Sequence, residues 1–129
     1  MKYTIVTPHP HNLRDEIIKR VQDGEDKNES KIDTWIVQKA TFKGNDGKTF
    51  EEEVLVHDTD AWKEVGGIRL IEDKDGNSQI HVRFFYWSNY PKDKRDNSQE
   101  LYIDGRLTEL LLVHFSDDIR SINLTEVNN

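Results

Sequence analysis

The stretch IHVRFFYW, residues 80–87, decides the fold that the sequence predicts. Its side chains alternate with the two-residue period of a β-strand, so the two faces of the strand differ. The predicted core face carries Ile80, Val82, Phe84 and Tyr86, and the second face carries His81, Arg83, Phe85 and Trp87. Arginine beside aromatic rings is typical of surfaces that bind a protein partner or flat rings. The alternative is that a second layer of the same chain covers this face.

Further strand-like runs lie on both sides of this stretch. Turn signals GNDG and DKDGN each separate two such runs, which predicts two β-hairpins. The predicted strands are residues 2–7, 34–42, 49–57, 67–72, 79–88 and 119–127. Because the intervening segments are short or polar, we expect all six strands to share one sheet.

Two segments have the pattern of amphipathic helices. The first begins at Asn12, a good N-cap, and runs to Asp23; the second begins at Asp104 and runs to about Phe115. A short helical turn is expected at residues 58–67. The predicted order is β-α-β-β-(short α)-β-β-α-β. This order indicates an α+β fold with one mixed or antiparallel sheet and two main helices packed on it.

We expect residues 1–129 to form a single domain, because their number is typical of one hydrophobic core. Residues 23–31 contain no apolar side chain and predict a mobile loop, and residues 90–99 predict a second polar loop.

The last predicted helix has more apolar residues than one face can hold. At 100° per residue, one stripe carries Leu107, Leu110, Leu111, His114 and Phe115. Leu112 and Val113 project away from that stripe. They indicate a homodimer or a protein partner, unless a second layer of the chain covers them.

Composition excludes several classes of function. The chain has 129 residues, 25 acidic and 18 basic side chains, a net charge of −7 and no cysteine. Disulfides, thiolate metal sites and cysteine nucleophiles are therefore excluded. The negative charge disfavours nucleic-acid and anionic-membrane binding. With neither a signal peptide nor a run of about 20 apolar residues, we expect a cytoplasmic protein that does not enter a membrane.

The stretch VTPHPHN, residues 6–12, raises the question of a metal site. His9 and His11, with His57 and Asp58 from a distant segment, would supply imidazole and carboxylate ligands suited to zinc. A small zinc hydrolase is the function that such a site would imply. The alternative is a connector that Pro8 and Pro10 stiffen between a strand and a helix.

No motif in the sequence identifies a reaction, and we expect no cofactor. The preferred hypothesis is a small acidic intracellular binding or regulatory protein without catalytic activity. A second alternative, beside the hydrolase, is an acidic inhibitor encoded by a mobile element that mimics the charge of nucleic acid. That alternative requires one surface to gather the acids Glu51, Glu52, Glu53, Asp58, Asp60, Glu72, Asp73 and Asp75.

Overall fold

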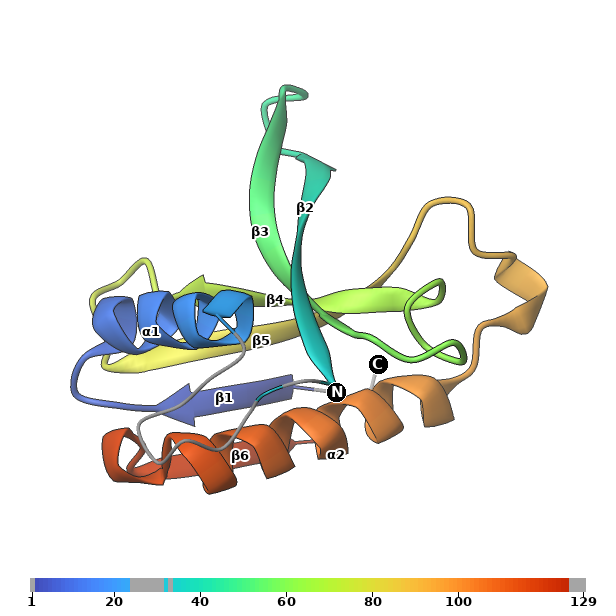
Figure 1. The fold of residues 1–129 in the computed structure, drawn as a ribbon. Helices are drawn as coiled ribbons and strands as arrows, with labels where there is room; N and C mark the ends of the chain where they lie inside the picture. Colours follow the sequence, from blue (N-terminus) through green and yellow to red (C-terminus); the bar gives the residue numbers. More distant parts are fainter. Residues whose placement is uncertain (1, 24–31, 33, 126–129) are drawn as a thin grey trace.

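The computed structural model describes residues 2–23, 32 and 34–125, and these residues form one six-stranded sheet with two main helices (Figure 1). The strands are β1 (Lys2–Val6), β2 (Trp35–Lys43), β3 (Thr49–His57), β4 (Gly66–Glu72), β5 (Gln79–Tyr86) and β6 (Ser121–Thr125). Their order across the sheet is β2-β3-β4-β5-β1-β6, and every neighbouring pair is antiparallel. The predicted α+β class is confirmed.

Both helices, α1 (Pro10–Asp23) and α2 (Asn97–His114), pack on the same face of the sheet (Figure 1). The core between them buries the alternate strand residues Tyr3, Ile5, Leu55, Ile68, Leu70, Ile80 and Val82. The helices contribute Leu13, Ile17, Ile18, Val21, Ile103, Leu107, Leu110 and Leu111. The predicted core face of β5 is therefore the face that the helices cover, and we call the opposite face of the sheet the open face.

The hairpin of β2 and β3 bends away from the rest of the sheet, and its distal half stands clear of the other strands (Figure 1). A second, smaller apolar cluster fills the inside of this bend, on the open face. It contains Ala40, Val54 and Val56, with Ile36, Phe42, Phe85 and Trp87 packed against them. The hairpin thus covers part of the open face with its own side chains.

Two glycines at the start of β4 permit this bend. A Cβ added at Gly66 would lie 1.9 Å from the carbonyl oxygen of Phe85. At Gly67 an added Cβ would lie 2.9 Å from the Leu55 carbonyl oxygen and 3.0 Å from Cζ of Phe85. A side chain at either position would therefore collide with the backbone of a neighbouring strand.

Helix α2 begins seven residues before the expected start at Asp104, and its N-cap is Asp96. The Asp96 side chain accepts a hydrogen bond from the backbone of Ser98, and the Gln99 side chain accepts one from the backbone of Asp96. This capping box satisfies two backbone donors that a helix start would otherwise leave unpaired. The predicted polar loop 90–99 is correspondingly shorter: it contains a 3-10 turn at Lys92–Lys94 and ends at the helix.

Several other boundaries differ from the sequence prediction: α1 begins at Pro10, so the expected N-cap Asn12 lies inside the helix, and β5 ends at Tyr86 instead of residue 88. Residues 58–65 form hydrogen-bonded turns instead of a short helix, because Gly66 and Gly67 belong to β4 rather than to a helix end. Of the predicted strand 119–127, Ser121–Thr125 form β6, and residues 126 and 127 lie outside the described residues. Most of the predicted mobile loop 23–31 lies outside the described residues; its first residue, Asp23, is the last of α1.

Asp104 is a buried acid in the middle of α2, with 2% of its surface exposed. Its Oδ1 has no hydrogen-bond partner among the described residues. Burial, and secondly the charge of Glu100, raise the pKa of Asp104 from 3.8 to about 7. The folded state therefore keeps a proton that the unfolded chain releases at lower pH.

Replacing Gly66 tests the bend. We expect Gly66→Ala to lower the free energy of unfolding by about 3 kcal/mol or more, because the new methyl group collides with backbone. Gly47→Ala is the control: its φ of +82° disfavours a side chain but nothing lies within 4 Å, so about 1 kcal/mol is expected. Urea unfolding midpoints measure both values. Equal losses in the two variants would contradict the collision.

Replacing Asp104 tests the buried proton. Because only the folded state holds this proton between about pH 4 and pH 7, the stability of the wild type should fall as pH rises through that interval. Asp104→Asn should remove the fall and be more stable at pH 8 by about 2 kcal/mol. Urea unfolding at several pH values measures the difference, with the exposed Glu109→Gln as control. Parallel pH profiles for Asp104→Asn and the wild type would disprove the buried proton.

Candidate binding site

The four residues of the predicted binding face all lie on the open face, which no helix covers in the described part of the chain. Arg83 is exposed, whereas His81, Phe85 and Trp87 are half-buried. The structure thus divides the face into a polar half near His81 and Arg83 and an aromatic half under the β2–β3 hairpin. The sequence left open that a second layer of the same chain covers this face. Such a layer covers only the aromatic half, and the β2–β3 hairpin forms it.

Arg83 lies directly opposite Arg69 on the neighbouring strand β4. Glu52 neutralises Arg69: Nε of Arg69 donates to Oε2 at 2.7 Å and Nη2 donates to Oε1 at 3.2 Å. The Arg69 guanidinium also lies over the ring of Phe42, 4.3 Å from its centroid. Arg83 forms no ion pair with another described residue. Of the two facing arginines, Arg69 thus has its counter-ion in Glu52, and Arg83 has none among the described residues.

The aromatic half is packed edge to face. The ring of Phe85 meets Phe42 at 5.1 Å and 86°, and meets Trp87 at 5.1 Å and 86°. The indole N–H of Trp87 donates to the carbonyl oxygen of Lys63 at 3.0 Å, which fixes the orientation of the ring. These contacts leave no broad stacking platform on Phe85, but they hold Trp87 firmly at the end of β5.

His81 lies in β5, on the open face, and its side chain contacts the turn between β4 and β5. Its Nε2 lies 2.9 Å from Oδ2 of Asp73. The same carboxylate accepts hydrogen bonds from the Gln79 side chain at 2.6 Å and the Asp75 backbone at 2.8 Å. Together these bonds hold the pKa of Asp73 well below its usual range, with the Gln79 bond contributing most. This arrangement gives His81 a structural role in closing the turn.

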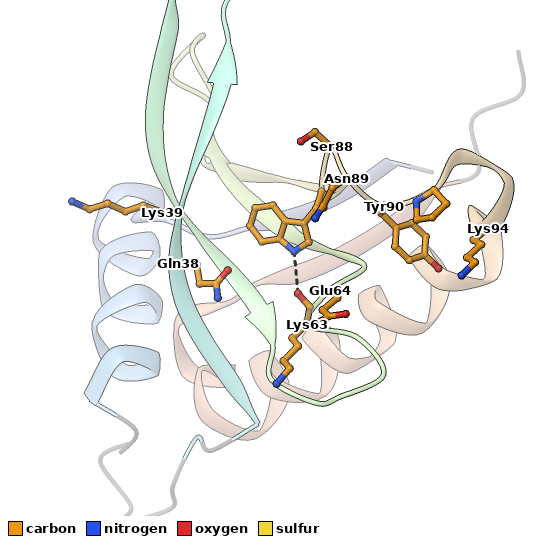
Figure 2. Close-up of a pocket in the computed structure, with 10 residues that line it drawn as sticks. Gln38, Lys39, Lys63, Glu64, Ser88, Asn89, Tyr90 and Lys94 are labelled. Atoms are coloured by element: carbon orange, nitrogen blue, oxygen red, sulfur yellow. Dashed lines mark hydrogen bonds between the residues drawn. The ribbon is translucent and has the colours of Figure 1, made fainter.

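A groove of about 810 Å³ begins where the open face ends at Trp87 (Figure 2). We call it the Trp87 groove. Its walls come from β2, the turn after β3, and the segment after β5, with Gln38, Lys63, Glu64, Trp87, Tyr90 and Lys94 among its lining residues. Lys63 and Lys94 lie on its rim, and the amine of Lys39 points away from Lys63 and Lys94 (Figure 2). Lys94 forms no ion pair with another described residue, whereas Lys63 lies 3.5 Å from Asp60.

Gln99 at the start of α2 fixes the wall of this groove. Its Oε1 accepts from the Tyr86 hydroxyl at 2.9 Å, and its Nε2 donates to the Tyr90 hydroxyl at 2.9 Å. The rings of Tyr86 and Tyr90 stack at 5.6 Å, and the Arg95 guanidinium lies 4.8 Å from the Tyr86 centroid. The groove wall is therefore ordered before any ligand binds, which reduces the entropy lost on binding.

The sequence patterns predict no site role for Lys63, Tyr90, Lys94 or Gln99. For Gln99 a signal exists: DNSQ, residues 96–99, has the spacing of a capping box, which marks a helix start. Lys63 and Lys94 carry no comparable pattern, because only the tertiary fold brings their segments to Trp87.

The two predicted interface residues of α2 are both exposed, Leu112 by 56% and Val113 by 61%. They face different surroundings. Leu112 lies beside β6 in one groove, and Val113 lies beside Trp35, His57 and Tyr102 in another. No second layer among the described residues covers either side chain.

The structure does not bring the four predicted metal ligands together. The Nδ1 of His11 lies 2.6 Å from Glu72 and its Nε2 lies 3.1 Å from Asp15, at the start of α1. His57 instead packs edge-on against Trp35, with ring centroids 5.1 Å apart. Within residues 2–23, 32 and 34–125, no group of three or more imidazole and carboxylate side chains is placed to hold a metal ion. His9, at the end of the loop, makes the first turn of α1 through its carbonyl oxygen, and Asp58 follows β3.

The pKa values of His11 and His57 should be shifted in opposite directions from the ordinary value of a histidine. The hydrogen bond to Glu72 and the charge of Asp15 raise the pKa of His11 above 6.5, whereas burial and the charge of Arg106 lower that of His57 below 6.5. An NMR titration of the ring C–H signals measures both midpoints. Glu72→Gln should lower the midpoint of His11 and leave that of His57 unchanged. Coincident midpoints in the wild type would contradict these environments.

No protein-family model matches the chain, and neither a curated protein nor a solved structure matches it. In the described part of the chain, neither helix has the length and apolar character that crossing a bilayer requires. The interpretation of the site depends on its own geometry.

Proposed function

We propose that the chain is a binding protein without catalytic activity, which recognises an acidic segment of a protein partner on the open face of its sheet. One observation carries the proposal. Arg83 is exposed and has no ion-pair partner among the described residues, and it lies on the same face of β5 as Trp87, which opens into the groove. Phe85 lies between them under Phe42 of the hairpin, so a partner segment that contacts both Arg83 and the groove has to pass around the outside of the hairpin.

The charges around this path favour an anionic ligand. Arg83 lies opposite Arg69, whose own charge Glu52 already neutralises. At the far end, Lys63 and Lys94 stand on the rim of the Trp87 groove, with Glu64 as the acid among its lining residues. A carboxylate of the partner beside Arg83 would supply the counter-ion that Arg83 lacks among the described residues. The path is therefore basic in a chain whose net charge is −7.

The aromatic packing favours a protein segment over a nucleic acid. Base stacking needs an open ring face, but the Phe85 ring is enclosed edge to face by Phe42 and Trp87. The net charge of −7 also repels a polyanion over a long range. A short acidic peptide avoids most of that repulsion, because it carries few charges and contacts the basic path directly.

The two alternative functions receive no support. The four ligands required by a zinc hydrolase are not brought together, as described above. For nucleic-acid mimicry, the acids would have to gather on one surface. Instead, Glu52 is paired with Arg69, Glu72 with His11 and Asp73 with His81. Asp58 and Asp60 follow β3, at the opposite end of β4 from Asp73 and Asp75.

A peptide-binding measurement tests the proposal. The probe is a fluorescein-labelled peptide of alternating glutamate and leucine, followed by anisotropy at low and at physiological salt. We expect saturable binding that weakens as salt is added. Arg83→Ala should weaken it about tenfold, the loss expected for one charge-assisted contact. Trp87→Phe should also weaken it, because the groove loses part of its wall.

Lys19→Ala is the matched control, since Lys19 is exposed on α1, beyond the opposite face of the sheet. It removes the same unit of charge and should leave the affinity unchanged. An oligodeoxythymidine of equal charge serves as competitor. If the oligonucleotide binds more tightly than the peptide, or if Lys19→Ala and Arg83→Ala have equal effects, the proposal is wrong. Absence of peptide binding at low salt would also overturn it.

A further inference from the structure

The margin of the sheet formed by β6 carries an apolar surface that the proposed function does not use. A groove of about 380 Å³ runs between α2 and β6 and is lined by Leu112, Ile119, Ile122 and Leu124, among others. Leu112 and Leu124 expose 56% and 46% of their surfaces. α2 and β6 run along the same margin of the sheet (Figure 1). The exposed leucines therefore form one continuous strip with the edge strand.

A line of residues along α2, at the side where the Thr108 hydroxyl meets that of Tyr3 in β1, extends this strip. Leu101, Gly105, Thr108 and Leu112 are spaced by four, three and four residues, so they lie in one line on the helix. Leu101 is 51% exposed. A Cβ added at Gly105 would meet nothing within 4 Å, so packing within the described chain does not require a glycine there. Glycine inside a helix costs about 1 kcal/mol relative to alanine, and close approach of another backbone is a common reason to keep it.

The edge strand itself is unprotected. β6 has the sequence SINLT, with neither a charge nor a proline, and in the described chain only β1 pairs with it. The opposite edge, β2, carries Lys39 and Lys43. Natural edge strands are usually protected by charged residues, prolines or bulges, because an open edge pairs with other chains. The contrast between the two edges marks β6 as the pairing edge.

We propose that this surface, β6 with the Leu101–Leu112 line of α2, binds a second copy of the same chain. In the dimer, β6 pairs antiparallel with β6 of the other copy about a two-fold axis, and the two α2 helices lie side by side across it. The two sheets then continue as one antiparallel sheet. Such an isologous contact is self-complementary by symmetry.

The distribution of charge favours a second copy of the chain as the partner at this surface. A chain with a net charge of −7 repels its own copies over most of its surface. β6 and the four-residue line on α2 contain no charged side chain, so two copies meet there without like charges in contact. The groove between α2 and β6 adds one charged side chain, Arg120, at the residue before β6.

The size of the surface also fits. A stable interface buries about 800 Å² on each partner, which is more than the edge of a five-residue strand supplies. The line from Leu101 to Leu112 adds about 16 Å of helix. Gly105 near its middle lets the two helices approach closely, and an antiparallel crossing there places Leu101 of one copy near Leu112 of the other.

Sedimentation equilibrium over a range of concentrations tests the proposal. The wild type should reach twice its chain mass of 15.2 kDa. Leu112→Glu should weaken the dimer at least tenfold. Val113→Glu is the control. Val113 is about as exposed on α2 as Leu112, but it lies in the groove with Trp35 and not in the groove with β6. The Val113→Glu variant should therefore still form the dimer. Circular dichroism and thermal unfolding establish that both variants fold.

Asn123→Lys is a second variant that needs no change on α2. In the register that centres the two-fold axis on Asn123, it places two like charges opposite each other, and dissociation should follow. Hydrogen exchange of the β6 amides should accelerate in both dissociating variants. A wild type that stays monomeric at high concentration overturns the proposal. So does equal weakening by Leu112→Glu and Val113→Glu, or association only when a different protein is added.

Discussion

The contact between Phe85 and the backbone of Gly66 and Gly67 is the constraint on which the open face depends. Without side chains at these positions, β4 passes close beneath Phe85 and within van der Waals reach of the Leu55 carbonyl. The sheet can then bend between β3 and β4, where Leu55 pairs with Ile68. The bend places Phe42 against Phe85 and builds the small cluster that supports Trp87. A larger residue at this point would separate the hairpin from β5 and remove the wall of the groove.

Charge on the open face follows from the same geometry. Because β3 lies beside β4, Glu52 reaches Arg69 with both carboxylate oxygens. Arg83 is one strand further from the hairpin, and no acid of the described chain reaches it. The acids nearest to the open face are committed elsewhere: Glu52 to Arg69, and Asp73 to the turn before β5. Arg83 therefore keeps a free charge on the open face, as Lys94 does on the rim of the Trp87 groove.

Local patterns predicted much of the fold. Alternation in residues 80–87 identified the core face of β5, and the bounds of β3 were predicted to the residue. The start of α2 was wrong because Asp104-Gly105 resembles a helix start, whereas the capping box at Asp96 and Gln99 is the real one. A buried aspartate inside a helix contradicts residue preference, so no pattern rule would place Asp104 there.

The site was less predictable than the fold. The sequence placed His81, Arg83, Phe85 and Trp87 on one face, but which face the helices cover depends on strand order. Lys63 and Lys94 come from different loops, and their approach to Trp87 depends on the bend at Gly66. The histidines of VTPHPHN do not meet His57, because His57 lies at the end of β3 and packs against Trp35. Strand order decides this placement as well.

The position of β1 affects how the chain folds. β1 lies between β5 and β6, so both of its partners come from the second half of the chain. The hairpins β2–β3 and β4–β5 form between neighbouring segments, but the first strand pairs only after most of the chain is available. Contacts of such long sequence separation slow folding. During synthesis on the ribosome, the strand KYTIV therefore emerges before both of its partner strands, and its apolar side chains stay exposed to aggregation and to chaperones until β5 and β6 follow.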